Sequence, residues 1–210
     1  MLPQRLTAGL LSLPLSAMIF VSVRYWIEFG KEERRGSGKQ DIPYNKFFLT
    51  LVAIGFFGMW PFWVGGIVFL FLNRYYTVFD FMTFSFSIAS FVQIAGLVVF
   101  YVGSIFLTWA LDFAGKYLRP STSGVYAKHK LIQDGPLGIV RHPYYVSYVL
   151  ILVGLSLTLT TLWPLLLALC VVIGMGPTAK AEEEQLTAWF GEEYQQYEQR
   201  VGRFFPKLFG

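Results

Sequence analysis

Long uncharged apolar runs alternate with short polar stretches along the whole chain. The first three runs cover residues 6–27, 47–72 and 84–111, and the third of them carries no charge at all. A bilayer core of about 30 Å needs about 20 apolar residues in a helix. The pattern therefore predicts three membrane-spanning helices over these ranges, with Pro61 as a kink in the second.

A fourth uncharged run, residues 144–176, is too long for one crossing of a bilayer. Pro164 divides it, because proline lacks a backbone N–H and disfavours a helical conformation in the residue before it. The run predicts two antiparallel helices, 144–161 and 163–176, joined by a tight connection. The chain is thus expected to cross the membrane five times. The first run is interpreted as a span rather than a cleaved signal peptide, because it is long and no small-residue cleavage site follows it.

The composition supports an all-α integral membrane protein. Hydrophobic residues make up 55% of the chain and charged residues only 14%, whereas soluble domains average about 45–50% and about 25%. The single cysteine, Cys170, lies inside an apolar run, so no disulfide framework exists. We expect neither a metal ion nor a nucleic-acid partner.

Basic residues are concentrated in the connections on one side of the predicted bundle. With five spans, the loops 28–46 and 112–143 and the C-terminal tail share that side. They contain Lys31, Arg34, Arg35, Lys39, Lys46, Lys116, Arg119, Lys128, Lys130, Arg141, Lys180, Arg200, Arg203 and Lys207. The positive-inside rule then predicts an outside N-terminus and a cytoplasmic C-terminus.

The two halves of the chain differ in their chemistry. Residues 1–112 are expected to form helices 1–3 with the basic cytoplasmic loop 28–46, and this part offers few reactive side chains. Residues 113–210 are expected to form the catalytic region. This region would comprise a polar loop (128–143), a helical hairpin (144–176) and an amphipathic C-terminal segment (177–210).

The first polar block precedes the hairpin and contains both histidines of the chain, His129 and His142. Pro143 suits the first turn of a helix, where its missing N–H costs nothing. Arg141 and His142 would then lie at the membrane surface beside the helix N-terminus, where free amides favour an anion. Taken alone, such a pair is more typical of a lipid-headgroup anchor.

The second polar block follows the hairpin. Apolar residues recur at helical spacing and predict an amphipathic helix that begins at Pro177. Glu182, Glu183 and Glu184 fall in its first turns, where acids complement the helix dipole. Three acids beside an anionic membrane surface are unusual, however, and a cationic ligand would resolve that conflict.

Together the two blocks resemble the isoprenylcysteine carboxyl methyltransferases, whose superfamily includes phospholipid methyltransferases. The matching pattern comprises His129-x-Leu131, Gly135, Arg141-His142-Pro143-x-Tyr145, Glu182-Glu183-x-x-Leu186-x-x-x-Phe190-Gly191-x-Glu193-Tyr194-x-x-Tyr197-x-x-Arg200-Val201 and Phe205-Pro206. The resemblance covers about residues 128–206. One departure is Leu137-Gly138, where many relatives have Tyr-Arg, so an aromatic hydroxyl is missing.

The resemblance implies S-adenosylmethionine as the methyl donor, bound at the cytoplasmic surface, and a lipophilic acceptor that reaches the site from the bilayer. It implies catalytic roles for Arg141, His142 and Arg200. Donor contacts are implied for His129, Leu131, Gly135, Tyr145, Glu182, Glu183 and Phe190. Tyr194 and Tyr197 are expected to contact the acceptor.

The nature of the acceptor stays open at this point. Carboxyl O-methylation of an isoprenylcysteine-like substrate needs no general base, whereas an amine or a thiol must lose a proton, which His142 could accept. The alternatives are therefore a phospholipid or amine N-methyltransferase and a small-thiol S-methyltransferase. A non-catalytic membrane scaffold is a further alternative. A transporter is disfavoured, since the spans are nearly free of charge and no repeated half is visible.

Overall fold

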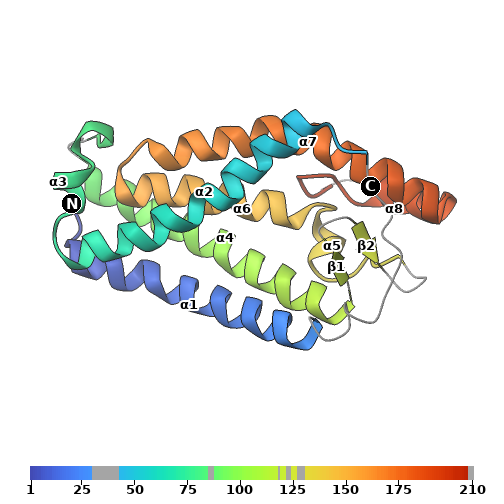
Figure 1. Cartoon of the computed structure of the whole chain (residues 1–210), viewed down its shortest axis with the longest axis horizontal. Coiled ribbons are helices and arrows are strands. Elements are labelled where there is room, and N and C mark those ends of the chain that lie inside the picture. Colours follow the sequence, from blue (N-terminus) through green and yellow to red (C-terminus); the bar gives the residue numbers. More distant parts are fainter. Residues whose placement is uncertain (30–42, 85–87, 118, 122–123, 127–130, 208–210) are drawn as a thin grey trace.

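The computed structural model describes residues 1–29, 43–84, 88–117, 119–121, 124–126 and 131–207. The described residues form five long helices that lie side by side in a bundle (Figure 1). These helices are α1 (Gln4–Phe29), α2 (Lys46–Phe71), α4 (Ala89–Tyr117), α6 (Pro143–Leu159) and α7 (Trp163–Phe190). The shorter elements are α3 (Tyr75–Val78), η2 (Asp80–Met82), α5 (Pro136–Ile139), α8 (Glu192–Arg200) and a small antiparallel ribbon of β1 (Arg119–Ser121) and β2 (Gly124–Tyr126).

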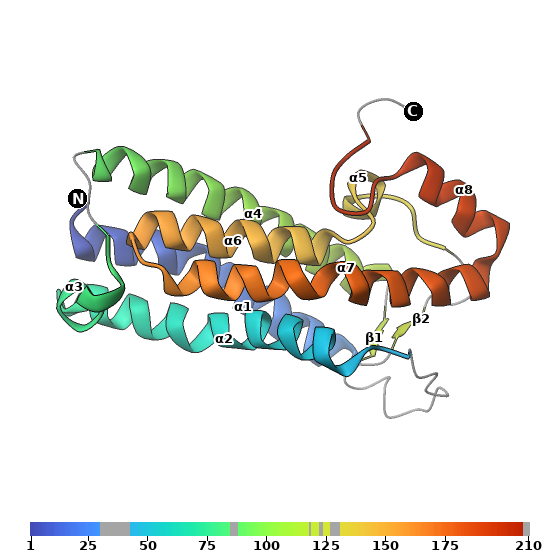
Figure 2. The ribbon, with the colours of Figure 1, turned by 90° about the horizontal axis from the view of Figure 1, so that it is seen from above.

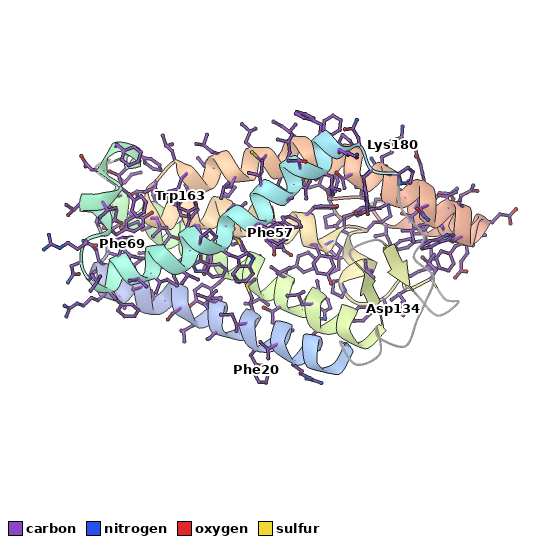
Figure 3. All side chains as sticks on the ribbon, viewed as in Figure 1. Phe20, Phe57, Phe69, Asp134, Trp163 and Lys180 are labelled. Atoms are coloured by element: carbon purple, nitrogen blue, oxygen red, sulfur yellow. The ribbon has the colours of Figure 1, made fainter. Side chains whose placement is uncertain are left out.

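The predicted class, an all-α integral membrane protein, is confirmed. Four of these helices, α1, α2, α4 and α7, are long and apolar enough to cross a membrane. Helix α6 is equally apolar but has 17 residues, which span about 26 Å. Large apolar side chains cover the outside of the bundle, and Phe20 and Phe57 are 69% and 75% exposed (Figure 3). Such a surface suits lipid rather than water.

The long helices alternate in direction, so both polar blocks meet at one end of the bundle. The connection from α4 to α6 and the C-terminal region lie at this end, and the N-terminus lies at the other (Figures 1 and 2). Lys180 and Asp134 mark the polar end, and Phe69 and Trp163 mark the opposite end (Figure 3). This arrangement agrees with five crossings.

Helix α6 ends and α7 begins as Pro164 predicts. Thr160 caps α6 in the left-handed conformation at φ 50°, and Pro164 lies in the first turn of α7. The connection between the two helices is therefore only three residues long. It is held by the Ser156 hydroxyl, which donates to the carbonyl of Thr161 at 2.5 Å.

The structure differs from the sequence expectation at Pro177. A separate amphipathic helix does not begin there, because α7 runs without a break from Trp163 to Phe190. Membrane helices tolerate an internal proline when neighbouring groups satisfy the backbone, and the Thr178 hydroxyl donates to the carbonyl of Gly174 at 2.8 Å. Residues 163–179 of α7 are uncharged, which suits a membrane crossing. From Lys180 onward the helix carries charges, which suits a position beyond the bilayer.

Glycines allow the inner helices to pack backbone against backbone. A Cβ added at Gly154 of α6 would lie 2.4 Å from the backbone nitrogen of Phe100 in α4. A Cβ added at Gly174 of α7 would lie 2.6 Å from the carbonyl oxygen of Phe48 in α2. Close approach of this kind is a major source of helix association inside membranes, where burial of apolar surface drives little. It fixes the positions of α6 and α7, which carry the polar residues beyond the bundle.

Gly154→Ala is expected to destabilise the bundle by about 1–3 kcal/mol, because the new methyl group meets a backbone that cannot rotate away. Thermal unfolding of the detergent-solubilised protein measures the effect. Gly65→Ala is the matched control, since a Cβ at Gly65 meets nothing within 4 Å. Equal stability of the two variants would contradict this account of α4–α6 packing.

Candidate functional site

Two short segments pair at the polar end of the bundle and bring the two polar blocks together. Val140 forms a parallel bridge with Gly202. The backbone N–H of Arg141 donates to the carbonyl of Gly202 at 2.9 Å, and that of His142 donates to Arg203 at 3.1 Å. The C-terminal segment, residues 201–207, is thereby fixed beside the N-terminus of α6. Arg141, His142 and Arg203 consequently face the same stretch of α7.

A buried carboxylate, Glu183 of α7, lies at the centre of this arrangement. Its Oε1 accepts hydrogen bonds at 3.0 Å from Arg141 Nε, at 3.0 Å from Arg203 Nε and at 3.0 Å from His142 Nε2. Its Oε2 accepts from Arg203 through both Nε, at 2.9 Å, and Nη2. The Glu183 side chain is only 5% exposed. A buried carboxylate is stable only with such pairing.

The surrounding donors keep Glu183 ionised. Burial raises the pKa of its carboxyl, but the hydrogen bonds from His142 and Arg203 and the charges of His142 and Arg141 together lower the pKa to about 2. Near neutral pH this side chain is a fixed negative charge that organises its three cationic neighbours.

Arg141 joins α6, α7 and α8. Besides Glu183 it binds the Glu198 carboxylate at 2.9 Å. Its Nη1 also donates to the backbone carbonyls of Glu198 at 3.0 Å and Val201 at 2.8 Å, at the C-terminus of α8. A cation is favourable there because the last carbonyls of a helix are otherwise unpaired. The guanidinium side chain is 6% exposed and has the role of a structural tie in this arrangement.

His142 lies between two adjacent carboxylates. Its Nδ1 is 3.2 Å from Glu182 Oε2, and its Nε2 is 3.0 Å from Glu183 Oε1. Burial lowers the pKa of His142, but the hydrogen bonds and charges of these two acids outweigh burial and raise it. Both ring nitrogens can donate only in the protonated imidazolium. In this geometry neither ring nitrogen of His142 is free to take a proton from a methyl acceptor.

Glu182 is more accessible than Glu183, with 26% of its side chain exposed. Its Oε1 accepts hydrogen bonds from the hydroxyls of Tyr145 at 2.9 Å and Tyr44 at 3.3 Å. Tyr44 belongs to the connection between α1 and α2, a part of the chain where the sequence indicated few reactive side chains. No pattern in the sequence pointed to it, because its contact partner lies 138 positions away.

Two buried tyrosines of α8 form a second small core beside the cluster, together with Leu131. The Tyr197 hydroxyl donates to the backbone carbonyl of Leu137 at 2.6 Å. The departure at Leu137 therefore leaves this contact intact, since it uses the main chain. The Tyr194 hydroxyl is fully buried and has no partner among the described residues. Burial and then the negative charge of Glu183 raise the pKa of Tyr194.

Gly135 begins α5 in a conformation that requires glycine. Its φ is +60°, and an added Cβ would lie 2.6 Å from the ring of Phe113 in α4. This turn packs the polar loop against the bundle. Phe190, at the end of α7, is half-buried against the Leu131 core.

The structure brings some of the expected site residues together and separates others. Arg141, His142, Tyr145, Glu182 and Glu183 meet in one cluster. Arg200 does not reach it. Its Nη2 donates instead to Gln133 at 2.5 Å on the exposed side of α8. His129 lies outside the described residues.

Arg203 and Glu198 belong to the cluster although sequence reasoning gave them no role. The resemblance implied a role for Arg200, which precedes Arg203 in the tail by three positions. Only the pairing of Val140 with Gly202 determines that Arg203 faces Glu183. Sequence spacing does not contain this long-range register.

Glu183→Ala is expected to lower the free energy of unfolding by about 3–5 kcal/mol, because it leaves Arg141 and Arg203 without their shared counter-ion. Circular dichroism during heating measures the loss. Glu184→Ala is the matched control, since the Lys180–Glu184 pair is 70% and 67% exposed and worth little. If the two variants melt together, Glu183 does not organise this end of the molecule.

Two comparisons with known proteins cover this region. A family model described as phospholipid methyltransferase matches residues 91–193. The protein-S-isoprenylcysteine O-methyltransferase of Schizosaccharomyces pombe (strain 972 / ATCC 24843) is 30% identical over 124 residues, which is 51% of this chain and 52% of that protein. The chain therefore spans about half the length of the curated relative that it matches.

The matched range extends from α4 into α8 and includes Arg141, His142, Glu182 and Glu183. The resemblance predicted from the sequence is confirmed by both matches. Residues 91–193 are thus similar to the phospholipid methyltransferase family, and the chain also resembles an isoprenylcysteine O-methyltransferase.

Proposed function

We propose that this protein transfers a methyl group from S-adenosylmethionine to a lipophilic acceptor at the membrane surface. The proposal rests on one observation, namely that the family match and the polar cluster involve the same residues. The residues that match the methyltransferase family also form the polar cluster of Arg141, His142, Glu182 and Glu183 at one end of a membrane bundle. The first acceptor that we propose is the carboxyl group of an isoprenylcysteine-like substrate.

The polar end has the chemistry that the donor requires. S-adenosylmethionine carries its methyl group on a sulfonium, so it supplies an activated electrophile. A partly exposed acid beside aromatic rings suits such a cation, and Glu182 is hydrogen-bonded by Tyr44 and Tyr145. The buried, unpartnered hydroxyl of Tyr194 is a further polar group available to a ligand. Leu131, Gly135 and Phe190 remain proposed donor contacts on the family pattern.

The lipophilic acceptor is supported by a row of aromatic side chains. Phe56 of α2 stacks on Tyr148 of α6 with centroids 3.9 Å apart, and it also contacts Tyr145 at 5.9 Å. Phe204 of the C-terminal segment contacts Tyr145 at 6.3 Å and His142 at 5.7 Å. The row leads from the apolar part of α2 to the polar cluster. We propose that an apolar acceptor approaches between the helices along it.

The state of His142 favours a carboxylate over an amine or a thiol. A carboxylate attacks the donor without losing a proton, so positioning supplies much of the acceleration. An amine or a thiol would need a base, and both nitrogens of His142 face acids. Arg200, exposed on α8, remains our proposed contact for an anionic group of the acceptor.

Phospholipid N-methylation is the second candidate. The description of the matching family model favours it, and an exposed arginine suits a lipid phosphate as well as a carboxylate. In either case the positive-inside rule supports a cytoplasmic position for the polar end, with the N-terminus on the opposite side.

Incubation of membranes containing the protein with methyl-labelled donor tests the proposal. Label that enters a lipid-soluble product and is released by mild base, as a methyl ester, is the expected result. Base-stable label in phospholipid would support N-methylation instead. Membranes without the protein are the control. If no label is transferred to any extractable acceptor and the purified protein does not bind S-adenosylmethionine in calorimetry, the protein is not a methyltransferase of this kind.

Arg200→Ala is expected to reduce methyl transfer about tenfold while the donor dissociation constant stays unchanged, because Arg200 touches none of the acids in the cluster. Steady-state kinetics and calorimetry separate the two effects. Lys180→Ala removes a basic side chain that is likewise exposed and serves as the control. Full activity of Arg200→Ala would exclude the proposed acceptor contact.

A further inference from the structure

Tyr44 reaches the polar cluster from the part of the chain that precedes residues 91–193. It lies two residues before α2, whose N-terminus is capped by Asn45 through a hydrogen bond of 3.0 Å from the N–H of Phe47. The first turns of α2 pack closely on α7, where Gly174 meets the carbonyl of Phe48. Backbone contact holds α2 against α7, and Tyr44 is therefore presented to the same helix that carries Glu182.

The Glu182 carboxylate is held from three sides. Tyr44 and Tyr145 donate to its Oε1, at 3.3 Å and 2.9 Å. Its Oε2 is left to face Nδ1 of His142 at 3.2 Å. The two hydroxyls and the imidazole come from the α1–α2 connection, from α6 and from the N-cap of α6. A carboxylate whose two oxygens are bound in this way cannot rotate without losing a partner.

We propose that Tyr44 is a positioning residue of the candidate site. Its hydroxyl, together with that of Tyr145, orients the Glu182 carboxylate so that the second oxygen holds the imidazole of His142. The helices outside the family match would thus contribute a side chain that completes the site. The part of this inference that concerns donor affinity rests on the proposed function. The contact of Glu182 with His142 does not depend on that function.

The groups that face His142 determine how a substitution of Tyr44 affects the pKa of this histidine. They are Glu182 and Glu183 of α7, Tyr145 of α6, and Phe204 with the backbone of Arg203 in the C-terminal segment, and Arg141 is the adjacent residue. Glu183 is already shared with two arginines. Glu182 is the acid whose orientation depends on neutral hydroxyls, so it is the partner that Tyr44 can affect.

Two possible physical roles of the Tyr44 hydroxyl predict opposite changes in the pKa of His142 when this hydroxyl is removed. If it positions Glu182, its removal loosens the carboxylate, His142 loses part of its partner, and the pKa of His142 falls. If it only withdraws charge from Glu182 through the hydrogen bond, its removal strengthens the acid's attraction for the imidazolium and the pKa of His142 rises. The direction of the change therefore separates positioning from a local electrostatic effect.

Tyr44→Phe keeps the ring and removes only the hydroxyl. The chain has two histidines, so ¹⁵N-histidine labelling in detergent micelles gives two imidazoles, and the spectrum of a His142→Gln variant assigns His142. We expect its titration midpoint to fall by about 0.5 to 1 pH unit in Tyr44→Phe. A midpoint that stays the same, or rises, overturns the proposal.

Two further variants control this measurement. Tyr101→Phe removes a hydroxyl that donates to the carbonyl of Leu10 at 2.8 Å, between α4 and α1 and away from the cluster. It should leave the midpoint unchanged, and an equal fall there would mean that any loosening of the bundle suffices. In a Glu182→Gln background Tyr44→Phe should have no further effect, since its only route to His142 is lost. An additive effect would refute action through Glu182.

Calorimetry with S-adenosylmethionine then tests the consequence for the donor. Tyr44→Phe should weaken binding about three- to tenfold, the range for one long hydrogen bond to a charged group. If the wild-type protein does not bind the donor at all, the proposed function fails while the result for His142 stands. If the wild-type protein binds and Tyr44→Phe binds equally well, the proposed function stands and Tyr44 has no role in the site.

Discussion

The ion cluster around Glu183 is the interaction on which the polar end depends. One buried carboxylate meets Arg141 from the start of α6, His142 beside it and Arg203 from the C-terminal segment. Neither Arg141 nor His142 could be buried alone, because an unpaired charge in a low-dielectric interior costs several kcal/mol. The acid thus joins the start of α6, α7 and the C-terminal segment. It also explains why the N-cap of α6 carries no capping side-chain bond of its own, since the His142 ring is bound to α7 instead.

The two adjacent acids of α7 have different tasks although the sequence presents them alike. Glu183 is buried and fully engaged with arginines, whereas Glu182 is partly exposed and held by two phenols and an imidazole. Successive residues of an α-helix are rotated by about 100° around its axis, so neighbours face different environments. Glu183 therefore stabilises the folded arrangement, and Glu182 remains near the surface that a cationic ligand could reach.

The apolar runs and the prolines sufficed to predict the bundle from sequence. The run 144–176 and Pro164 predicted the hairpin of α6 and α7, because chain length and a missing N–H act locally. The prediction of a helix start at Pro177 was wrong, because a helix that is packed against its neighbours can continue through an internal proline. Arg203 and Tyr44 were not predictable for a related reason. Their partners are distant in the chain, and only the registers between segments bring them together.

The continuity of α7 through Pro177 fixes the distance of Glu182 from the uncharged part of the same helix. The helix is one rod of 28 residues, about 42 Å long. Glu182 follows Ala179, where the uncharged stretch of α7 ends, by three positions, which places it about 4.5 Å further along the axis. A rod without a hinge keeps this height constant while the bundle stays in the membrane. For the proposed function, this fixed height means that an acceptor held in the bilayer must carry its methylated group at the level of Glu182.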